Sequence, residues 1–157
     1  DARWTVKGGE KHYGYKNHTK VDADSKIITD YSITNAAVHD SNKFVDFIDE
    51  TDKIVYADSA YSGREIAESL PGNVKNRIHE KGYRNRPLTD KQKKSNHNKS
   101  KVRARIEHVY GFMTGSMKGI TVRSIGQQRA GFNVGLTNLV YNLCRYSILQ
   151  RQRVYAG

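Results

Sequence analysis

Two carboxylates occupy positions where a side chain could act on a ligand. The first, Asp58, follows the short apolar run IVYA at 54–57 and comes directly before a turn. An apolar run without alternation is typical of a strand that is buried on both faces of a sheet. Ligands of open α/β sheets bind beyond the carboxyl ends of the strands, so Asp58 is a candidate ligand-binding residue. The alternative interpretation of Asp58 is that it is an ordinary polar residue of a loop, without a role in binding.

The second carboxylate, Glu107, lies in a helix that we predict from about Lys99 to Met113. Apolar residues recur there at intervals of three and four, at Val102, Ile106, Val109, Tyr110 and Met113. Arg103 precedes Glu107 by one helical turn, so the two side chains share a face. A guanidinium in this place could orient the carboxylate or hold a phosphate. The alternative is a surface ion pair.

The charge of the chain points to a polyanionic partner. Lys and Arg number 27 against 16 Asp and Glu, which gives a formal net charge of +11. The segment 75–105 alone carries twelve Lys or Arg and two acids. Such a segment can displace counterions from nucleic acid, although it could also be a solvated loop. No apolar run is long enough to cross a membrane, and the single cysteine, Cys144, excludes a disulfide framework and a cysteine-based zinc site.

The predicted elements alternate between strands and helices. We expect a β-hairpin from strands at 12–22 and 27–34. After it we expect a helix at 40–50, a strand at 54–57, a helix at 63–70, a strand at 74–79, and helices at 99–113 and 131–149. Ser62 and Glu65 match a capping box for the second helix. The polar segment 82–100 is predicted as a loop with one helical turn at Thr89–Gln92. This order indicates one mixed α/β domain.

The last predicted helix carries an apolar stripe, which consists of Phe132, Leu136, Leu139, Val140, Leu143 and Cys144. A stripe of this kind is typical of the side of a helix that faces a core.

Four segments together resemble a known family, the DDE transposases of bacterial insertion sequences, specifically the insertion-sequence-five group. The segments are DARWTVKGGEKHYGYKNHTKVD, ITNAAVHDS, YADSAYSG and VRARIEHVYGFM. The last two resemble the motifs around the second catalytic aspartate and the catalytic glutamate. The resemblance implies an RNase H-like catalytic domain over 1–157, with Asp58 and Glu107 as catalytic residues and metal ligands.

The resemblance also implies a cofactor and partners. Two Mg²⁺ or Mn²⁺ ions would support phosphodiester cleavage and strand transfer at transposon ends. The expected partners are double-stranded DNA, as transposon ends and target, and further copies of the chain in a homodimer or higher oligomer, with no membrane. The expected location is the bacterial cytoplasm, in association with the nucleoid. The candidate DNA-binding residues are Arg103, Arg105, Lys101, Lys118, Lys16 and Arg64.

The sequence departs from the family pattern in two ways. The family's first catalytic aspartate belongs to a strand that precedes the segment matching Asp1, and the aspartates at 22, 24 and 30 match no motif. We therefore expect an N-terminally incomplete catalytic domain that supplies two of three metal ligands. It could be an artificially shortened chain, a natural fragment or the second part of a transposase encoded in two pieces. In addition, Ser100 stands where related transposases have a tyrosine, and Thr114 where they have a lysine.

The missing strand predicts dimerisation, strand exchange or low stability, because its neighbours would lack partners. Two other functions remain open from the sequence. One is a DNA-binding fragment of a transposase without catalytic activity. The other is a nuclease that takes no part in transposition.

Overall fold

The chain folds into small sheets and helices, which confirms the mixed α/β prediction. The computed structural model describes residues 1–119 and 121–156, apart from the side chains of Lys7, Tyr155 and Ala156. The chain divides into two compact units. Unit 1 contains Asp1–His39 and His108–Gly157, and unit 2 contains Asp40–Glu107.

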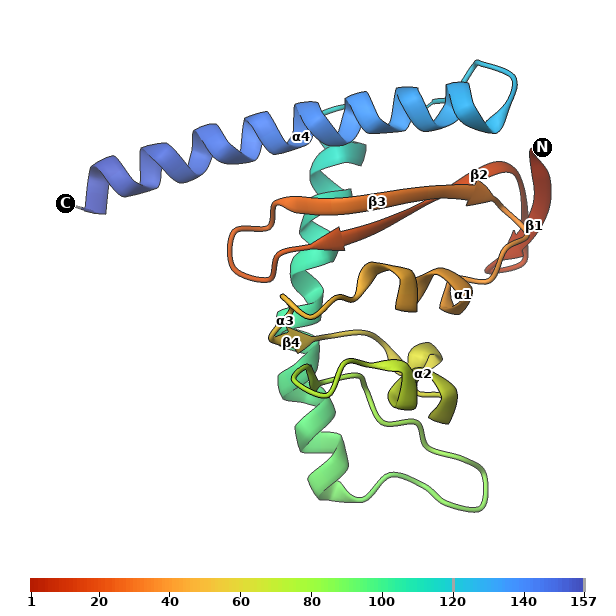
Figure 1. Ribbon diagram of the computed structural model, residues 1–157, viewed down its shortest axis with the longest axis vertical. Coiled ribbons are helices and arrows are strands. Elements are labelled where there is room, and N and C mark those ends of the chain that lie inside the picture. Colours follow the sequence, from red (N-terminus) through yellow and green to blue (C-terminus); the bar gives the residue numbers. More distant parts are fainter. Residues whose placement is uncertain (120, 157) are drawn as a thin grey trace. The chain divides into compact units, whose positions relative to one another are not determined.

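Unit 1 is built on a three-stranded antiparallel sheet in the order β1-β2-β3 (Figure 1). Its strands are β1 (Arg3–Lys7), β2 (Glu10–Val21) and β3 (Ile28–Asn35). β2 and β3 form the hairpin that the alternating pattern predicted. A bulge between Lys20 and Val21 shifts the register just before the turn.

Strand β1 was not predicted from the sequence, since the first predicted strand begins at residue 12. Gly8 and Gly9 have φ angles of 61° and 87°, which only glycine adopts readily, and they turn β1 back onto β2. Trp4 then lies opposite Tyr13, with the ring centroids 5.1 Å apart. The short strand was missed because its two apolar residues, Trp4 and Val6, are exposed and signal no core.

Helix α4 (Gln127–Ala156) packs along β3 in unit 1 (Figure 1). The Asn142 side chain bonds both backbone groups of Ile28, accepting from its N–H at 2.9 Å and donating to its carbonyl at 2.8 Å. Gly131 and Gly135 lie on the side of α4 that faces the strand, and a Cβ at Gly135 would collide with the Tyr31 ring. The helix and the strand therefore approach closely.

The core of unit 1 joins the strands to both long helices. Helix α3 (Asp90–Gly115) contributes Val109 and Met113, which are 0% and 2% exposed. They pack with Ile28 of β3 and Tyr141 of α4. The Phe112 ring also meets the Tyr141 ring edge to face, at 5.7 Å between centroids.

The buried side of α4 is not its apolar stripe. The buried residues are Ala130, Val134, Asn138 and Tyr141. Most of the stripe is instead exposed, at Phe132, Leu136, Leu139, Val140 and Leu143, and Cys144 is only half-buried. The prediction that the stripe faces a core is therefore wrong within unit 1, because small residues on the other side allow closer packing against β3.

Unit 2 contains short elements. They are α1 (Ser41–Phe44), the 3-10 helix η1 (Val45–Phe47), β4 (Ile54–Val55), the 3-10 helix η2 (Ser59–Tyr61), α2 (Arg64–Ser69), β5 (Lys75–Asn76) and the first part of α3. β4 and β5 are parallel. The strand 54–57 is shorter than predicted, and Ile54 is 44% exposed, so it is not buried on both faces.

Two helix starts in unit 2 differ from the predictions. The capping box at Ser62 is not formed, because Gly63 is the N-cap of α2 and the Ser62 hydroxyl donates to the Ser59 carbonyl at 2.8 Å. Helix α3 begins at Asp90 rather than near Lys99, so part of the predicted loop is helical.

The helical turn predicted at Thr89–Gln92 is confirmed, and a capping box between these two residues starts α3. The Gln92 N–H donates to the Thr89 hydroxyl at 3.3 Å, and the Gln92 side-chain oxygen accepts from the Thr89 N–H at 2.9 Å. This reciprocal pair satisfies backbone donors at the helix start, where little apolar periodicity announces a helix.

Candidate functional site

Asp58 terminates the parallel strand pair of unit 2. Beyond β4 and β5 the ladder continues, since the Arg77 N–H donates to the Val55 carbonyl at 2.9 Å and the His79 N–H to the Ala57 carbonyl at 3.0 Å. Asp58 is the next residue after this last bond. The sequence-based prediction that it lies at the carboxyl end of a strand is thus confirmed, and this edge is where open α/β sheets bind ligands.

The backbone around Asp58 fixes the direction of its carboxylate. Asp58 is extended, with φ −79° and ψ 178°, and caps η2 by accepting the Ala60 N–H at 2.7 Å. A carboxylate has about four acceptor positions on its two oxygens. One capping bond therefore orients the half-buried group and leaves acceptor capacity for a ligand.

Glu107 forms an ion pair with Arg103 on α3. The Arg103 Nη2 donates to the Glu107 Oε1 at 2.8 Å, and the side chains are 33% and 61% exposed, respectively. The Arg103 Nε is buried and has no hydrogen-bond partner in the described part of the chain. The pair expected from the helical spacing is therefore present.

His79 connects the strand end to α3. Its backbone bonds Ala57, next to Asp58, and its Nε2 lies 3.3 Å from the Ser100 hydroxyl on α3. Burial lowers the pKa of His79, the positive charges of Arg103 and Lys99 lower it further, and the negative charge of Asp58 opposes them. The pKa of His79 thus responds to the charges of Asp58 at the strand end and of Arg103 and Lys99 on α3.

Polar side chains fasten the segment 78–80 to the same helix. The Asn96 side chain accepts from the Glu80 N–H at 3.0 Å and donates to the Glu80 carbonyl at 2.9 Å. The Lys99 ammonium donates to the Ile78 carbonyl at 2.9 Å and lies 3.5 Å from the Glu80 carboxylate. The extension of β5 is therefore bonded both to the extension of β4 and to α3, which holds Asp58 and the helix in one unit.

Sequence reasoning missed His79 and Asn96. A signal for His79 existed, because it follows one strand just as Asp58 follows another, and parallel neighbouring strands end at the same edge. Nothing in the sequence indicated Asn96, since it lies in the segment that was predicted as a loop.

The candidate DNA-binding residues are distributed over both units. Unit 2 holds Arg64, Lys101, Arg103 and Arg105, and unit 1 holds Lys16 and Lys118. Lys101 and Lys118 are exposed. Arg64 already pairs with Glu68 at 2.6 Å, and Lys16 donates to the Val38 carbonyl at 2.7 Å.

Other carboxylates have local structural roles. The Asp1 carboxylate accepts from the Gln127 N–H at the start of α4, at 3.4 Å. Asp22 accepts from the Ser25 N–H at 2.6 Å in the turn between β2 and β3. Within residues 1–119 and 121–156, no group of three or more His, Cys, Asp or Glu side chains is placed to hold a metal ion.

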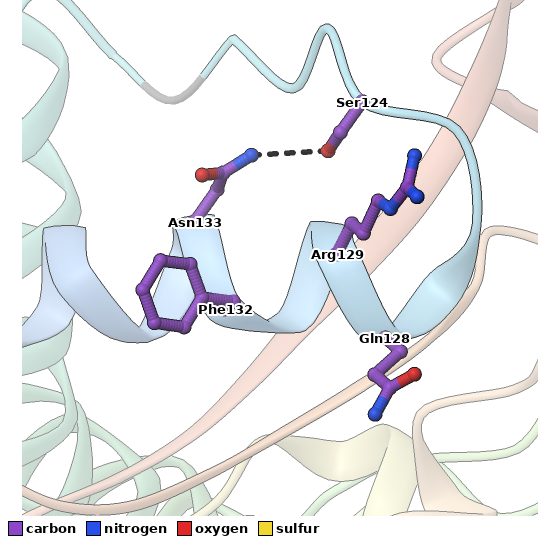
Figure 2. A pocket seen from close by; sticks show the side chains of 5 residues that line it. All are labelled: Ser124, Gln128, Arg129, Phe132 and Asn133. Atoms are coloured by element: carbon purple, nitrogen blue, oxygen red, sulfur yellow. Dashed lines mark hydrogen bonds between the residues drawn. The ribbon is translucent and has the colours of Figure 1, made fainter.

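Two open depressions lie away from these groups. One is lined by Ser124 and by the start of α4, at Gln128, Arg129, Phe132 and Asn133, and the Asn133 amide donates to the Ser124 hydroxyl at 3.0 Å (Figure 2). The other lies in unit 2, where residues 50–54 meet Asn73 and Lys75. Neither is lined by Asp58 or Glu107. Of the helices in the described part of the chain, none combines the length and the apolar character needed to cross a membrane.

Comparison with known proteins identifies the family. Residues 1–143 match the family model described as transposase DDE domain. The chain belongs to the DDE transposase family. This transposase chain is 36% identical over 114 residues to a transposase for insertion sequence element IS1106 from Neisseria meningitidis serogroup B. The match covers 71% of the chain and 39% of that relative. No solved structure matches.

The carboxylates of this transposase chain fit a divalent cation. Mg²⁺ is usually held by one or two protein carboxylates, together with water and substrate phosphate. Asp58 and Glu107 supply two groups with hard oxygen donors, each with one oxygen bonded to a neighbour and further acceptor capacity. Their donor chemistry therefore suits Mg²⁺ or Mn²⁺ rather than a softer metal.

Proposed function

We propose that the chain is a catalytic region of an insertion-sequence transposase that cuts DNA at transposon ends and joins it to target DNA. Asp58 and Glu107 are the proposed metal ligands and catalytic residues. The observation that carries the proposal is the position of Asp58 at the end of a parallel strand pair that is bonded, through residues 78–80, to the helix carrying Glu107.

The finer fold proposed for this region is RNase H-like, and residues 1–157 would form a single catalytic domain. An antiparallel sheet followed by a parallel strand pair and long helices supports this assignment. In such a domain a further carboxylate, on a strand that pairs with this region, would complete the metal site.

Each candidate residue has a defined task in this proposal. Two bound divalent ions would activate the attacking oxygen and stabilise the leaving oxygen. Asp58, aimed by its bond to the Ala60 N–H, would present its carboxylate to an ion. Arg103 would hold Glu107 in place and offer the donors of its terminal nitrogens to a DNA phosphate.

The phosphate contacts proposed around this site are Lys101 and Arg105 on α3, with Arg64, Lys16 and Lys118 as outlying contacts. For Arg64 and Lys16 a contact with DNA would replace the present partners, Glu68 and the Val38 carbonyl. We expect their individual contributions to be the smallest.

A nicking assay tests the catalytic proposal. A labelled duplex that carries the transposon ends is incubated with the chain and Mn²⁺, and nicked and joined products are counted. Asp58→Asn and Glu107→Gln should each abolish nicking, because both remove a charge while keeping size and hydrogen bonding. Glu68→Gln is the matched control, since Glu68 also forms an exposed i,i+4 pair with an arginine. Metal-dependent nicking that is equally strong in all three variants would contradict the proposal.

A second candidate function is DNA binding without cleavage. The first part of α3 favours it, because it is a helix with four exposed lysines, Lys91, Lys93, Lys94 and Lys101, within eleven residues. A basic helix of this kind binds duplex through its phosphates with little sequence preference. Binding without metal-dependent nicking would favour this function, and nicking without strand transfer would favour a nuclease.

Salt dependence tests the DNA-binding helix. Affinity falls as salt is added, and each phosphate contact makes the slope of log affinity against log salt concentration steeper by about 0.9. The double variant Lys91→Gln, Lys94→Gln should therefore make this slope shallower by about two. The control is the double variant Lys43→Gln, Lys53→Gln. It removes the same two positive charges from unit 2 at positions outside α3, and it should leave the slope unchanged. A double change on α3 without effect would exclude the helix as the DNA contact.

A further inference from the structure

Helix α4 presents a second apolar face that no described element covers. Its sheet side is buried, from Ala130 to Tyr141. The other face carries large side chains whose exposed fractions range from 46% to 66%, namely Phe132, Leu136, Leu139, Val140, Leu143 and Tyr146. Phe132 projects from the helix near the depression at its start (Figure 2). A soluble helix needs one apolar stripe for its own core, so the second stripe calls for another partner.

The spacing of the exposed face is that of a helix-pairing seam. Phe132, Leu136, Leu139, Leu143 and Tyr146 follow one another at intervals of four, three, four and three residues. This period of 3.5 residues is the one that keeps apolar side chains along a seam between two helices. The buried face has a different set of residues, so one helix can serve the sheet and a partner at once.

The size of this face matches one half of a dimer interface. An aromatic side chain buries roughly 150–250 Å², so two aromatic and four smaller aliphatic side chains, each about half exposed, offer on the order of 500 Å² of apolar area. Homodimer interfaces are about 65% apolar, so this area corresponds to an interface of about 800 Å² on each partner. That is the usual size for a specific complex.

We propose that the exposed stripe of α4 binds the same stripe of a second copy of the chain, with the two helices antiparallel. The stripe is nearly symmetric in sequence about Leu139, since Phe132 and Tyr146 each lie seven residues from it. In an antiparallel pair Leu139 therefore meets Leu139 of the second copy at the two-fold axis, and Phe132 meets Tyr146.

Charge favours the antiparallel arrangement over the parallel one. Helix α4 contains no acidic residue, and two arginines, Arg151 and Arg153, lie near its C-terminal end against one, Arg129, in its first turn. Parallel helices would place these arginines against their counterparts and align the two helix dipoles. Antiparallel helices separate the two C-terminal arginine pairs, set each opposite the single Arg129, and let the helix dipoles oppose one another. This assignment is independent of the metal and DNA chemistry proposed for unit 2.

Sedimentation of the 157-residue chain tests the interface. We expect a dimer at micromolar concentration, more stable at 0.5 M than at 0.1 M salt because salt screens the repulsion between two chains of charge +11. Leu139→Asp should weaken the dimer at least 30-fold, even though it lowers the positive charge. Gln152→Asp makes the same type of charge change on an exposed position of α4 outside the stripe and should retain the dimer. Circular dichroism verifies that both variants fold.

Cysteine cross-linking tests the direction of the helices. In a chain with Cys144→Ser, Leu139→Cys should form a linked dimer under mild oxidation. Gln150→Cys should not, because position 150 continues the seam and would meet its counterpart only in a parallel pair. A chain that remains monomeric at high salt, or a dimer that Leu139→Asp leaves intact, would overturn the proposed interface. Cross-linking through position 150 would overturn the antiparallel arrangement. None of these results depends on nicking activity.

Discussion

Unit 1 and unit 2 are stabilised by different kinds of contact. In unit 1, Val109 and Met113 are almost completely buried in a core shared by strands and helices. In unit 2 the buried apolar residues are few and modest in size, including Ala57, Val74 and Ile78. There the backbone is fastened by polar side chains.

The polar contacts of unit 2 fix positions at a modest gain in stability. A hydrogen bond contributes only about 1 kcal/mol net to the free energy of unfolding, but a buried donor or acceptor that is left without its partner costs about 1–3 kcal/mol. The proposed catalytic carboxylates lie in this polar unit. Functional segments are commonly drawn from the less stable parts of a protein, so we expect unit 1 to serve as the stable support and unit 2 to open more readily.

The largest expected effect on stability comes from disrupting the core of unit 1. Met113→Ala should destabilise the chain by about 2–5 kcal/mol, because it removes a fully buried side chain and leaves a cavity. Urea denaturation measures the change. Met117→Ala is the control, since Met117 is only partly buried at the edge of the same core and should cost clearly less. Equal costs would mean that the core is not the main support of unit 1.

The second largest effect on stability is expected from the hydrogen bonds that join residues 78–80 to α3. Asn96→Ala should destabilise unit 2 locally by about 1–2 kcal/mol, because it leaves two backbone groups of Glu80 without partners. Hydrogen exchange should become faster at residues 78–80 but not at β2 or β3. Asn98→Ala, at an exposed position on the same helix, should have no such effect. Faster exchange throughout both units would show that they are not stabilised separately.

A smaller effect is expected at the start of α3. Thr89→Ala should cost about 0.5–1 kcal/mol and fray the first turn, because the helix loses its capping hydroxyl. Amide exchange of residues 90–93 reports the fraying. Thr114→Ala removes a hydroxyl from the other end of α3 and should leave this turn unchanged. A protected first turn in the Thr89 variant would mean that the cap is dispensable.

The smallest effect is a pH dependence from His79. The folded chain holds its pKa below the usual 6.5, so the unfolded chain binds the proton more readily. This contribution to stability is complete above pH 6.5 and is lost as the pH falls through the lowered pKa. His79→Asn should flatten this part of the stability profile. His97→Asn, at an exposed position of α3, controls for the loss of a histidine. An unchanged profile in the His79 variant would contradict the assignment.

The sequence predicted elements where side-chain patterns are regular. The alternation in β2 and β3 and the spacing in the second half of α3 were sufficient, because each side chain there packs as its local pattern requires. Of the first part of α3 only the turn at Thr89–Gln92 was predicted, since Asp90 to Ser100 have no apolar periodicity and are held by Thr89, Asn96 and Lys99. Contacts of this kind join residues far apart in sequence and leave no local pattern.

For the candidate site, the sequence located individual residues but not what connects them. The strand-end position of Asp58 and the pairing of Glu107 with Arg103 follow from local spacing. The role of His79 depends on which strand lies beside β4, and that is a property of the tertiary fold. Likewise, the pattern of α4 revealed an apolar stripe, but only packing against β3 determines which side is covered.

The two glycines of α4 have a consequence for the order of folding. Gly131 and Gly135 allow the helix to lie close to β3, but each lowers intrinsic helix stability by about 1 kcal/mol relative to alanine. The same half of the helix contains several further residues of low helix propensity, namely Asn133, Val134, Thr137, Asn138 and Val140. This half should not persist as a helix alone, so we expect the β2–β3 hairpin to form first and to provide the surface on which α4 becomes ordered.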